Sequence, residues 1–145
     1  MTLKNLLGIT LDAITADKAQ VGKLLAAAER NIANAQLKGL SAENRFDAAY
    51  KAIMQLAMVS LNANGYRTLT SKPGHHQTAI QTLPQTVGLP QAKVIVLDAL
   101  RKQRNVSDYA GDLTTDAAVE ECLASAKELL THVRAWLAAN RPDLI

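Results

Sequence analysis

The sequence predicts an all-α fold: a four-helix bundle of the up-and-down type, with a long connection that contains a short helix between the second and third long helices. Three observations support this prediction. The 145 residues suit one globular domain, so residues 1–145 are taken as a single domain. Only five residues are aromatic, which leaves Leu, Ile, Val, Met and Ala to build the core and favours helices over β-sandwiches. Apolar residues recur at helical spacing in four segments separated by Gly, Asn and Pro.

The first two long helices have clear boundary signals. Thr15 or Asp17 can cap the N-terminus of the first helix, and Gly39 suits its stop. Ser41 can cap the second helix, which Asn64-Gly65 ends. The apolar stripe of the first helix consists of Val21, Leu24, Leu25, Ala28, Ile32 and Ala35. The stripe of the second consists of Phe46, Ala49, Tyr50, Ile53, Leu56, Ala57 and Leu61.

The segment from Gly65 to Pro90 is the long connection. Gly and Pro residues interrupt it, and only His76, Ile80 and Leu83 suggest a short helical turn. A segment of this length inside a small domain is either a crossover or a functional loop.

The last two long helices follow this connection. Pro90 can occupy the first turn of the third helix, which runs toward Tyr109 and closes at Gly111. The fourth begins near Thr115-Asp116, ends near Asn140, and is the most clearly amphipathic segment of the chain. Its stripe includes Cys122, which is interpreted as a small core residue, and His132 beside the stripe is interpreted as a surface or half-buried packing residue.

The leader, residues 1–14, has leucines on a helix-like pattern and is predicted to form a helix that packs on the bundle or on a second subunit. Polar residues such as Asn5 and Asp12 interrupt any signal-peptide core, and no run reaches the ~20 apolar residues that a bilayer crossing needs. A single cysteine fits a reducing compartment. The expectation is a cytoplasmic protein with no membrane association.

Charge and motifs exclude several classes of function. The net charge of +3 permits a polyanionic partner without requiring one. There is no Gly-rich phosphate loop, no His-Glu-x-x-His and no Ser-His-Asp order, and the one cysteine excludes Cys-rich zinc modules. We therefore expect no metal site and no cofactor.

The end of the third helix carries a polar face. Arg101, Arg104, Asn105 and Asp108 are spaced i, i+3, i+4 and i+7, so they share one side of the helix. One interpretation is a solvated helix end, in which an Arg104–Asp108 pair contributes no more than ~0.5 kcal/mol. The other is an inward-facing polar cluster or a cleft, because these residues continue an apolar stripe.

The order of elements and two short motifs resemble HEPN-domain proteins. The motifs are Gly74-His75-His76 in the long connection and Arg104-Asn105-Val106-Ser107-Asp108-Tyr109 at the end of the third helix. The resemblance covers residues 16 to 139 approximately. The ribonuclease motif of this family is an Arg, usually followed by a polar residue, with a His about five positions after the Arg. Arg104-Asn105 matches its first half, and Tyr109 stands where the His would fall.

This resemblance implies a role for each half of the motif. In the ribonuclease members the Arg binds the scissile phosphate and the His transfers protons, whereas a tyrosine with a pKa near ~10 is a poor base at neutral pH. Arg104, with Asn105, would keep the ability to bind an anion. His75 or His76 could replace the missing histidine if one folds back over the third helix; alternatively both cap the short helix after Gly74.

The preferred hypothesis is a HEPN-like, homodimeric module of toxin–antitoxin type that binds RNA, a nucleotide or a partner protein, and that is catalytically degenerate. Its binding residues would be Arg101, Arg104, Asn105, Asp108 and Tyr109. The resemblance also implies a nucleotidyltransferase as a partner protein. Two alternatives stay open: a metal-independent ribonuclease toxin with Arg104, His75 and His76 as candidate catalytic residues, and a purely structural interaction bundle.

Overall fold

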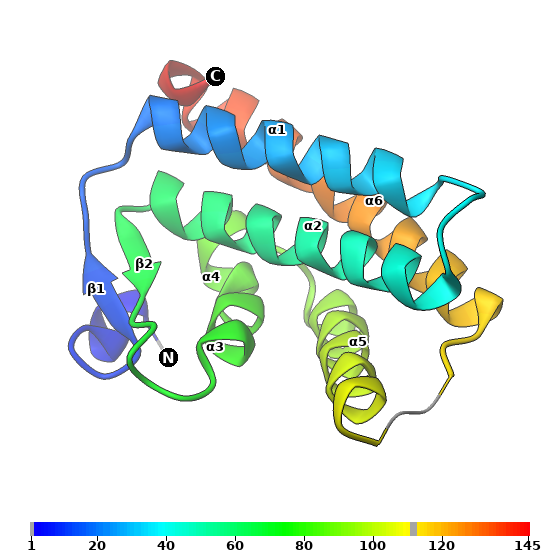
Figure 1. The fold of residues 1–145 in the computed structure, drawn as a ribbon. Coiled ribbons are helices and arrows are strands. Elements are labelled where there is room, and N and C mark those ends of the chain that lie inside the picture. Colours follow the sequence, from blue (N-terminus) through cyan, green and yellow to red (C-terminus); the bar gives the residue numbers. More distant parts are fainter. Residues whose placement is uncertain (1, 111–112) are drawn as a thin grey trace.

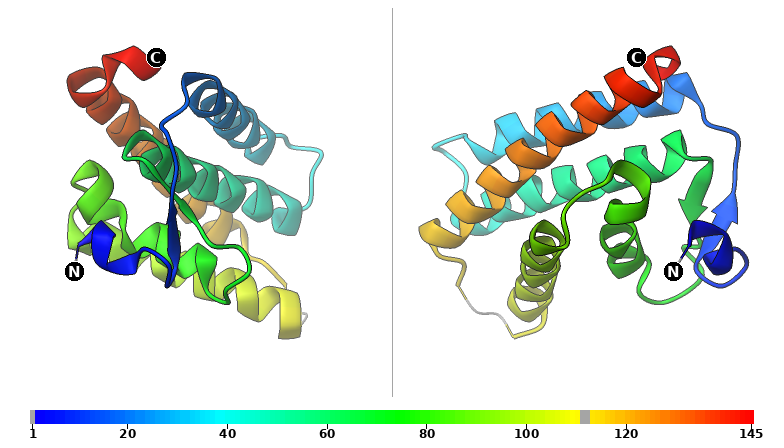
Figure 2. Two further views of the ribbon diagram at one scale, coloured as in Figure 1. Left: turned by 90° about the vertical axis from the view of Figure 1, so that its left-hand side faces the viewer. Right: turned by 180° about the vertical axis from the view of Figure 1, so that it is seen from behind.

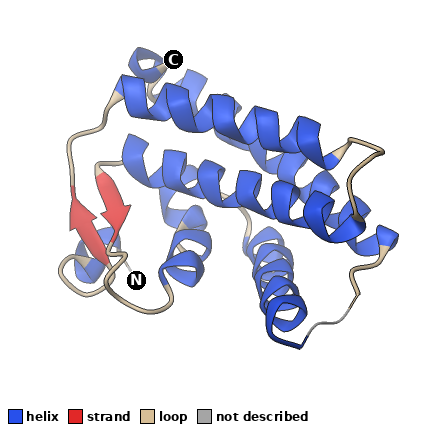
Figure 3. Ribbon diagram, in the orientation of Figure 1, coloured by secondary structure: helices blue, strands red, loops and turns tan. Residues whose placement is uncertain are grey.

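The computed structural model describes residues 2–110 and 113–145, without the side chains of residues 107–110. Helices dominate it, and a two-stranded sheet is the only extended structure in the described part of the chain (Figure 3), so the all-α class is confirmed. The elements in chain order are a 3₁₀ helix (Leu3–Leu6), β1 (Leu11–Ala13), α1 (Lys18–Ala35), α2 (Ala42–Ala63), β2 (Tyr66–Thr68), α3 (His75–Gln81), α4 (Leu83–Val87), α5 (Gln91–Ala110), α6 (Asp116–Asn140) and a 3₁₀ helix (Pro142–Leu144). Among the described residues, no helix combines the length and apolar character that a membrane crossing requires.

Helix α2 is the centre of the fold. It packs lengthwise against α1 and α6, and α1 runs antiparallel to both (Figures 1 and 2). More than half of the α2 residues are buried, from Phe46 to Ala63, whereas α1 buries only Val21, Ala28, Ile32 and Ala35. A helix that packs against two long helices needs a wide apolar face, and α2 has one.

Helix α5 departs from the predicted bundle. The four long helices form where the sequence predicts them, but only α1, α2 and α6 lie side by side, and α5 lies across α2 (Figures 1 and 2). The reason is that α3 and α4 pack against α2 and against α5. They occupy the side of α2 along which a fourth lengthwise helix would have to lie, so the up-and-down arrangement is not confirmed.

The helix starts agree with the capping predictions. Asp17 Oδ1 accepts a hydrogen bond from the Ala19 amide at 3.0 Å, and Ser41 Oγ accepts one from the Asn44 amide at 3.1 Å. Thr115 caps α6 in the same way. These bonds satisfy amides that have no partner inside the helix. The end of α1 differs from the prediction, since the helix stops at Ala35 and a turn precedes Gly39. The predicted stop of α5 at Gly111 lies outside the described residues.

The leader does not form the predicted continuous helix. Only Leu3–Leu6 is helical, as a short 3₁₀ turn, and Leu11–Ala13 pairs as an antiparallel strand with Tyr66–Thr68. Leu11 is fully buried, so the strand inserts one leucine into the core. The pattern of leucines alone could not distinguish these structures, because the pairing partner of this strand lies more than fifty residues along the chain.

Gly65 connects the end of α2 to the leader, and its replacement by alanine is expected to destabilise the fold. Its φ is 86°, and a Cβ atom would lie 3.3 Å from the carbonyl oxygen of Ile14, whose amide binds the Gly65 carbonyl. We expect Gly65→Ala to lower the free energy of unfolding by about 1–2 kcal/mol in urea denaturation. The matched control is Gly22→Ala in α1, where a Cβ meets open space, and it should stabilise by about 0.5–1 kcal/mol. Equal stability of the two variants would contradict the strained role of Gly65.

Candidate functional site

Three segments that lie far apart in the sequence meet where α5 crosses α2. Tyr50 of α2 lies between His76 of α3 and Arg104 of α5. The Tyr50 hydroxyl is 3.3 Å from His76 Nδ1, and the Arg104 guanidinium carbon is 5.1 Å from the centre of the Tyr50 ring. We call these residues, together with Arg101 and Asp47, the Tyr50 cluster.

Tyr50 and His76 owe their places to the local fold. Tyr50 belongs to the apolar stripe of α2 and is 2% exposed, as its helical spacing predicts. His76 is the second residue of α3. Gly74, the residue before this helix, has a left-handed backbone conformation. The His75 ring meets the His76 ring edge to face at 4.6 Å between centroids. Both histidines are half-buried, and His76 is the one that contacts α2.

The cations of α5 are held by carboxylates on two helices. Arg104 Nε lies 3.6 Å from Asp47 Oδ1, one turn before Tyr50 on α2. Arg101 Nε donates to Asp98 Oδ1 at 2.8 Å, and Lys102 Nζ is 3.5 Å from the other oxygen of that carboxylate. Burial alone would raise the pKa of Asp98, but the hydrogen bond and charge of Arg101, with those of Lys102, lower it. Asp98 is therefore ionised at neutral pH.

Among the described side chains, cations outnumber carboxylates in this region. Three cations, Arg101, Lys102 and Arg104, face the two carboxylates Asp47 and Asp98. The Arg104 side chain is 32% exposed. An anion can therefore approach the Arg104 guanidinium from solvent.

Burial favours the neutral forms of Tyr50 and His76. It raises the pKa of Tyr50 to about 12, and the positive charges of Arg104 and Arg101 offset only part of this effect. Burial also lowers the pKa of His76, and the charges of His75, Arg104 and Arg101 lower it further. At neutral pH the phenol can then donate its proton to His76 Nδ1, in the tautomer that carries its N–H on Nε2.

The lowered pKa of His76 predicts a loss of stability in acid. Above the ordinary pKa of 6.5 this histidine is neutral in both the folded and the unfolded chain. As the pH falls, the unfolded chain binds the proton first, so this contribution to stability is lost as the pH drops through the folded pKa. We expect His76→Gln to lose less stability than the parent protein between about pH 7.5 and about pH 5 in urea denaturation. The same pH dependence in both proteins would show that His76 carries no such linkage.

The structure brings some of the predicted site residues together and not others. The structure brings Arg104, Arg101 and His76 together, with His75 against His76. Asn105 is exposed. The side chains of Asp108 and Tyr109 lie outside the described residues, and with them the predicted Arg104–Asp108 pair and the role of Tyr109.

Sequence reasoning missed Asp47 and Asp98. Each precedes a site residue by three positions on the same helix: Asp47 before Tyr50, and Asp98 before Arg101. The i, i+3 spacing of Asp98 and Arg101 is a pairing signal that could have been found. Asp47 could not have been found in this way, because its partner Arg104 lies on another helix.

Two other reactive residues are structural. Cys122 is fully buried with its Sγ 3.9 Å from the Phe46 carbonyl oxygen, and burial raises its pKa to about 12, so it is the core residue that the sequence predicts. His132 Nε2 lies 2.7 Å from the Val87 carbonyl oxygen and ties α6 to α4. In the described part of the chain, no group of three or more His, Cys, Asp or Glu side chains could hold a metal ion.

Comparison of the chain with protein-family models, with curated proteins and with solved structures found no match. The resemblance to HEPN-domain proteins therefore stays a prediction.

Proposed function

We propose that this chain is a binding module that holds a phosphate group of RNA at the Tyr50 cluster. One observation carries the proposal: Arg104 and His76, each a candidate from the sequence, both contact Tyr50. A cation and a neutral N–H donor on either side of one aromatic ring suit a phosphodiester, which offers two charged oxygens as acceptors.

The chemistry of Arg104 supports this role. A guanidinium can bind phosphate through two parallel N–H bonds, and Tyr50 and Asp47 limit its orientations before the ligand arrives. His76 Nε2–H can donate a further hydrogen bond while Tyr50 occupies Nδ1.

The finer parts of the proposal come from the HEPN resemblance. They are a homodimer, a toxin–antitoxin context and a nucleotidyltransferase partner. Exposed apolar side chains such as Ile9 and Val106 offer surfaces that a second subunit would cover. A homodimer would double the number of Arg104 sites and strengthen binding to a polymer by avidity.

Replacing Arg104 tests the proposal. Fluorescence anisotropy with a short single-stranded RNA at low salt should show Arg104→Ala binding about ten- to hundred-fold more weakly, the loss expected for a hydrogen-bonded charged contact. Arg30→Ala, which removes the same charge from an exposed position on α1, should weaken binding by no more than about two-fold. If the Arg104→Ala and Arg30→Ala variants bound RNA with equal affinity, a specific site at Arg104 would be refuted. Circular dichroism of each variant checks that the helices are intact.

A second candidate function, a metal-independent ribonuclease, is favoured by the position of His76. Its lowered pKa leaves the imidazole neutral at neutral pH, as a general base requires. In the other tautomer, in which Nδ1–H donates to the Tyr50 hydroxyl oxygen, Nε2 would take the proton of a ribose 2′-hydroxyl while the 2′-oxygen attacks the phosphorus held by Arg104, and the departing 5′-oxygen would take a proton from water. Cleavage of RNA in the presence of a chelator that disappears in His76→Ala would establish this activity. If purified protein leaves diverse RNAs intact, only the binding function remains.

A further inference from the structure

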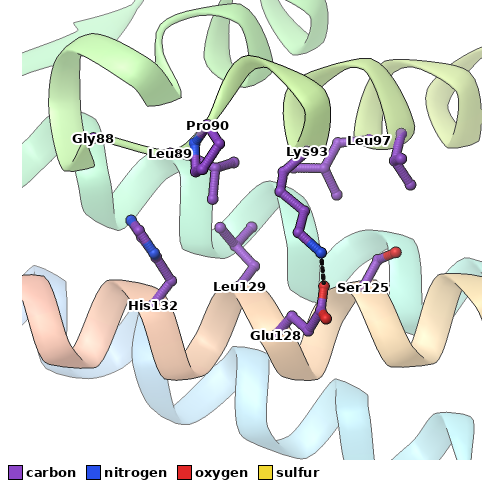
Figure 4. A pocket seen from close by; sticks show the side chains of 10 residues that line it. Gly88, Leu89, Pro90, Lys93, Leu97, Ser125, Glu128, Leu129 and His132 are labelled. Atoms are coloured by element: carbon purple, nitrogen blue, oxygen red, sulfur yellow. Dashed lines mark hydrogen bonds and ion pairs between the residues drawn. The ribbon is translucent and has the colours of Figure 1, made fainter.

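A groove separate from the Tyr50 cluster lies between the first turns of α5 and the middle of α6 (Figure 4). Its volume is about 400 Å³, within the range of small-molecule sites. The floor is apolar and well buried, since Leu89, Leu97 and Leu129 line it and each is at most 6% exposed. The groove exists because α5 turns away across α2 and does not pack closely along α6.

One ion pair bridges the two sides of this groove. Lys93 Nζ of α5 lies 2.9 Å from Glu128 Oε2 of α6, and Figure 4 shows the pair spanning the space between the helices. Both side chains are more than half exposed. An exposed pair contributes at most about 1 kcal/mol, so a ligand can separate the two charges at small cost.

Two further polar groups lie at the ends of the groove. Because the Val87 carbonyl can only accept, His132 Nε2 donates to it. The Ser125 hydroxyl at the other end is half-buried, and among the described residues it has no hydrogen-bond partner. Figure 4 shows Ser125 and His132 on either side of Leu129 along α6.

We propose that this groove binds a small apolar zwitterion, of which an apolar α-amino acid is the simplest kind. Lys93 is the one cation and Glu128 the one carboxylate among its lining residues. A ligand with a single charge would pair with one of them and leave the other unpaired beside a like charge. A ligand with both charges gives each side chain a new partner, and its apolar part lies on the leucine floor.

The experiment compares molecules that differ by one charge. The probes are L-leucine, L-phenylalanine and L-tryptophan, with 3-methylbutylamine and 4-methylpentanoate as forms of leucine that lack the carboxylate and the ammonium. Methyl NMR of the full chain should show shifts at Leu89, Leu97 and Leu129 with at least one amino acid. The amine and the acid that each lack one charged group of leucine should bind about ten-fold more weakly than leucine does. The absence of shifts with all three amino acids, or equal binding of the amine or acid, would overturn the proposal.

Two variants assign the charges. Lys93→Met and Glu128→Gln keep most of each side chain's shape. Each should weaken the binding of the amino acid about ten-fold. Lys127→Met, an exposed lysine of α6 that does not line the groove, is the control and should bind as the parent does. Unchanged affinity in both groove variants would show that the ion pair does not recognise the ligand.

Discussion

Replacing Ile53 with alanine is expected to lower the free energy of unfolding by about 3–4 kcal/mol, a large share of the stability of a domain of this size. Ile53 is fully buried at the middle of α2, the helix that packs against both α1 and α6. The substitution removes apolar contacts and leaves a cavity that surrounding helices can fill only in part. Urea denaturation followed by circular dichroism measures the change.

An exposed isoleucine provides the control for this prediction. Ile95 of α5 is 63% exposed, and Ile95→Ala should change the free energy of unfolding by no more than about 0.5 kcal/mol. If Ile53→Ala were as stable as Ile95→Ala, α2 could not be the centre of the core.

Replacing Tyr50 with alanine is expected to affect both stability and the cluster. The ring is 2% exposed, so its loss should cost about 3–5 kcal/mol in the free energy of unfolding. It would also remove the surface over which Arg104 lies and the hydroxyl that His76 contacts. On the proposed function, RNA affinity should fall together with stability.

Tyr50→Phe separates these two effects. It keeps the ring and its contact with Arg104 but removes the hydroxyl, so its loss of stability should be about 1 kcal/mol. The His76 pKa, followed by NMR titration, should change in Tyr50→Phe because a hydrogen-bond partner of Nδ1 is gone. An unchanged His76 titration would show that the Tyr50–His76 contact does not hold in solution.

The parts of the fold that the sequence predicts well are those that depend on neighbouring residues. Asp17, Ser41 and Thr115 cap their helices through bonds to amides two or three residues away, so the starts of α1, α2 and α6 can be found from short patterns. The crossing of α5 and the strand Leu11–Ala13 depend on where distant segments pack. No local pattern contains that information.

The same distinction applies to the Tyr50 cluster. The polar face that holds Arg101 and Arg104 follows from helical spacing, and His76 stands out beside a glycine in a long connection. That Tyr50 joins them depends on α3 and α5 packing at one point of α2. The sequence places Tyr50 in the apolar stripe of α2, which is correct, but its position between Arg104 and His76 depends on the three-dimensional arrangement.

The pairing of β1 with β2 also has a consequence for synthesis on the ribosome. Leu11 pairs with Thr68, so the first strand leaves the exit tunnel long before its partner. At about 5–20 residues per second, the interval is roughly 3–11 s. During it Leu11, which the finished fold buries completely, remains accessible to chaperones. Strand β1 is thus made before α2 but can pair with β2 only after α2 has been synthesised.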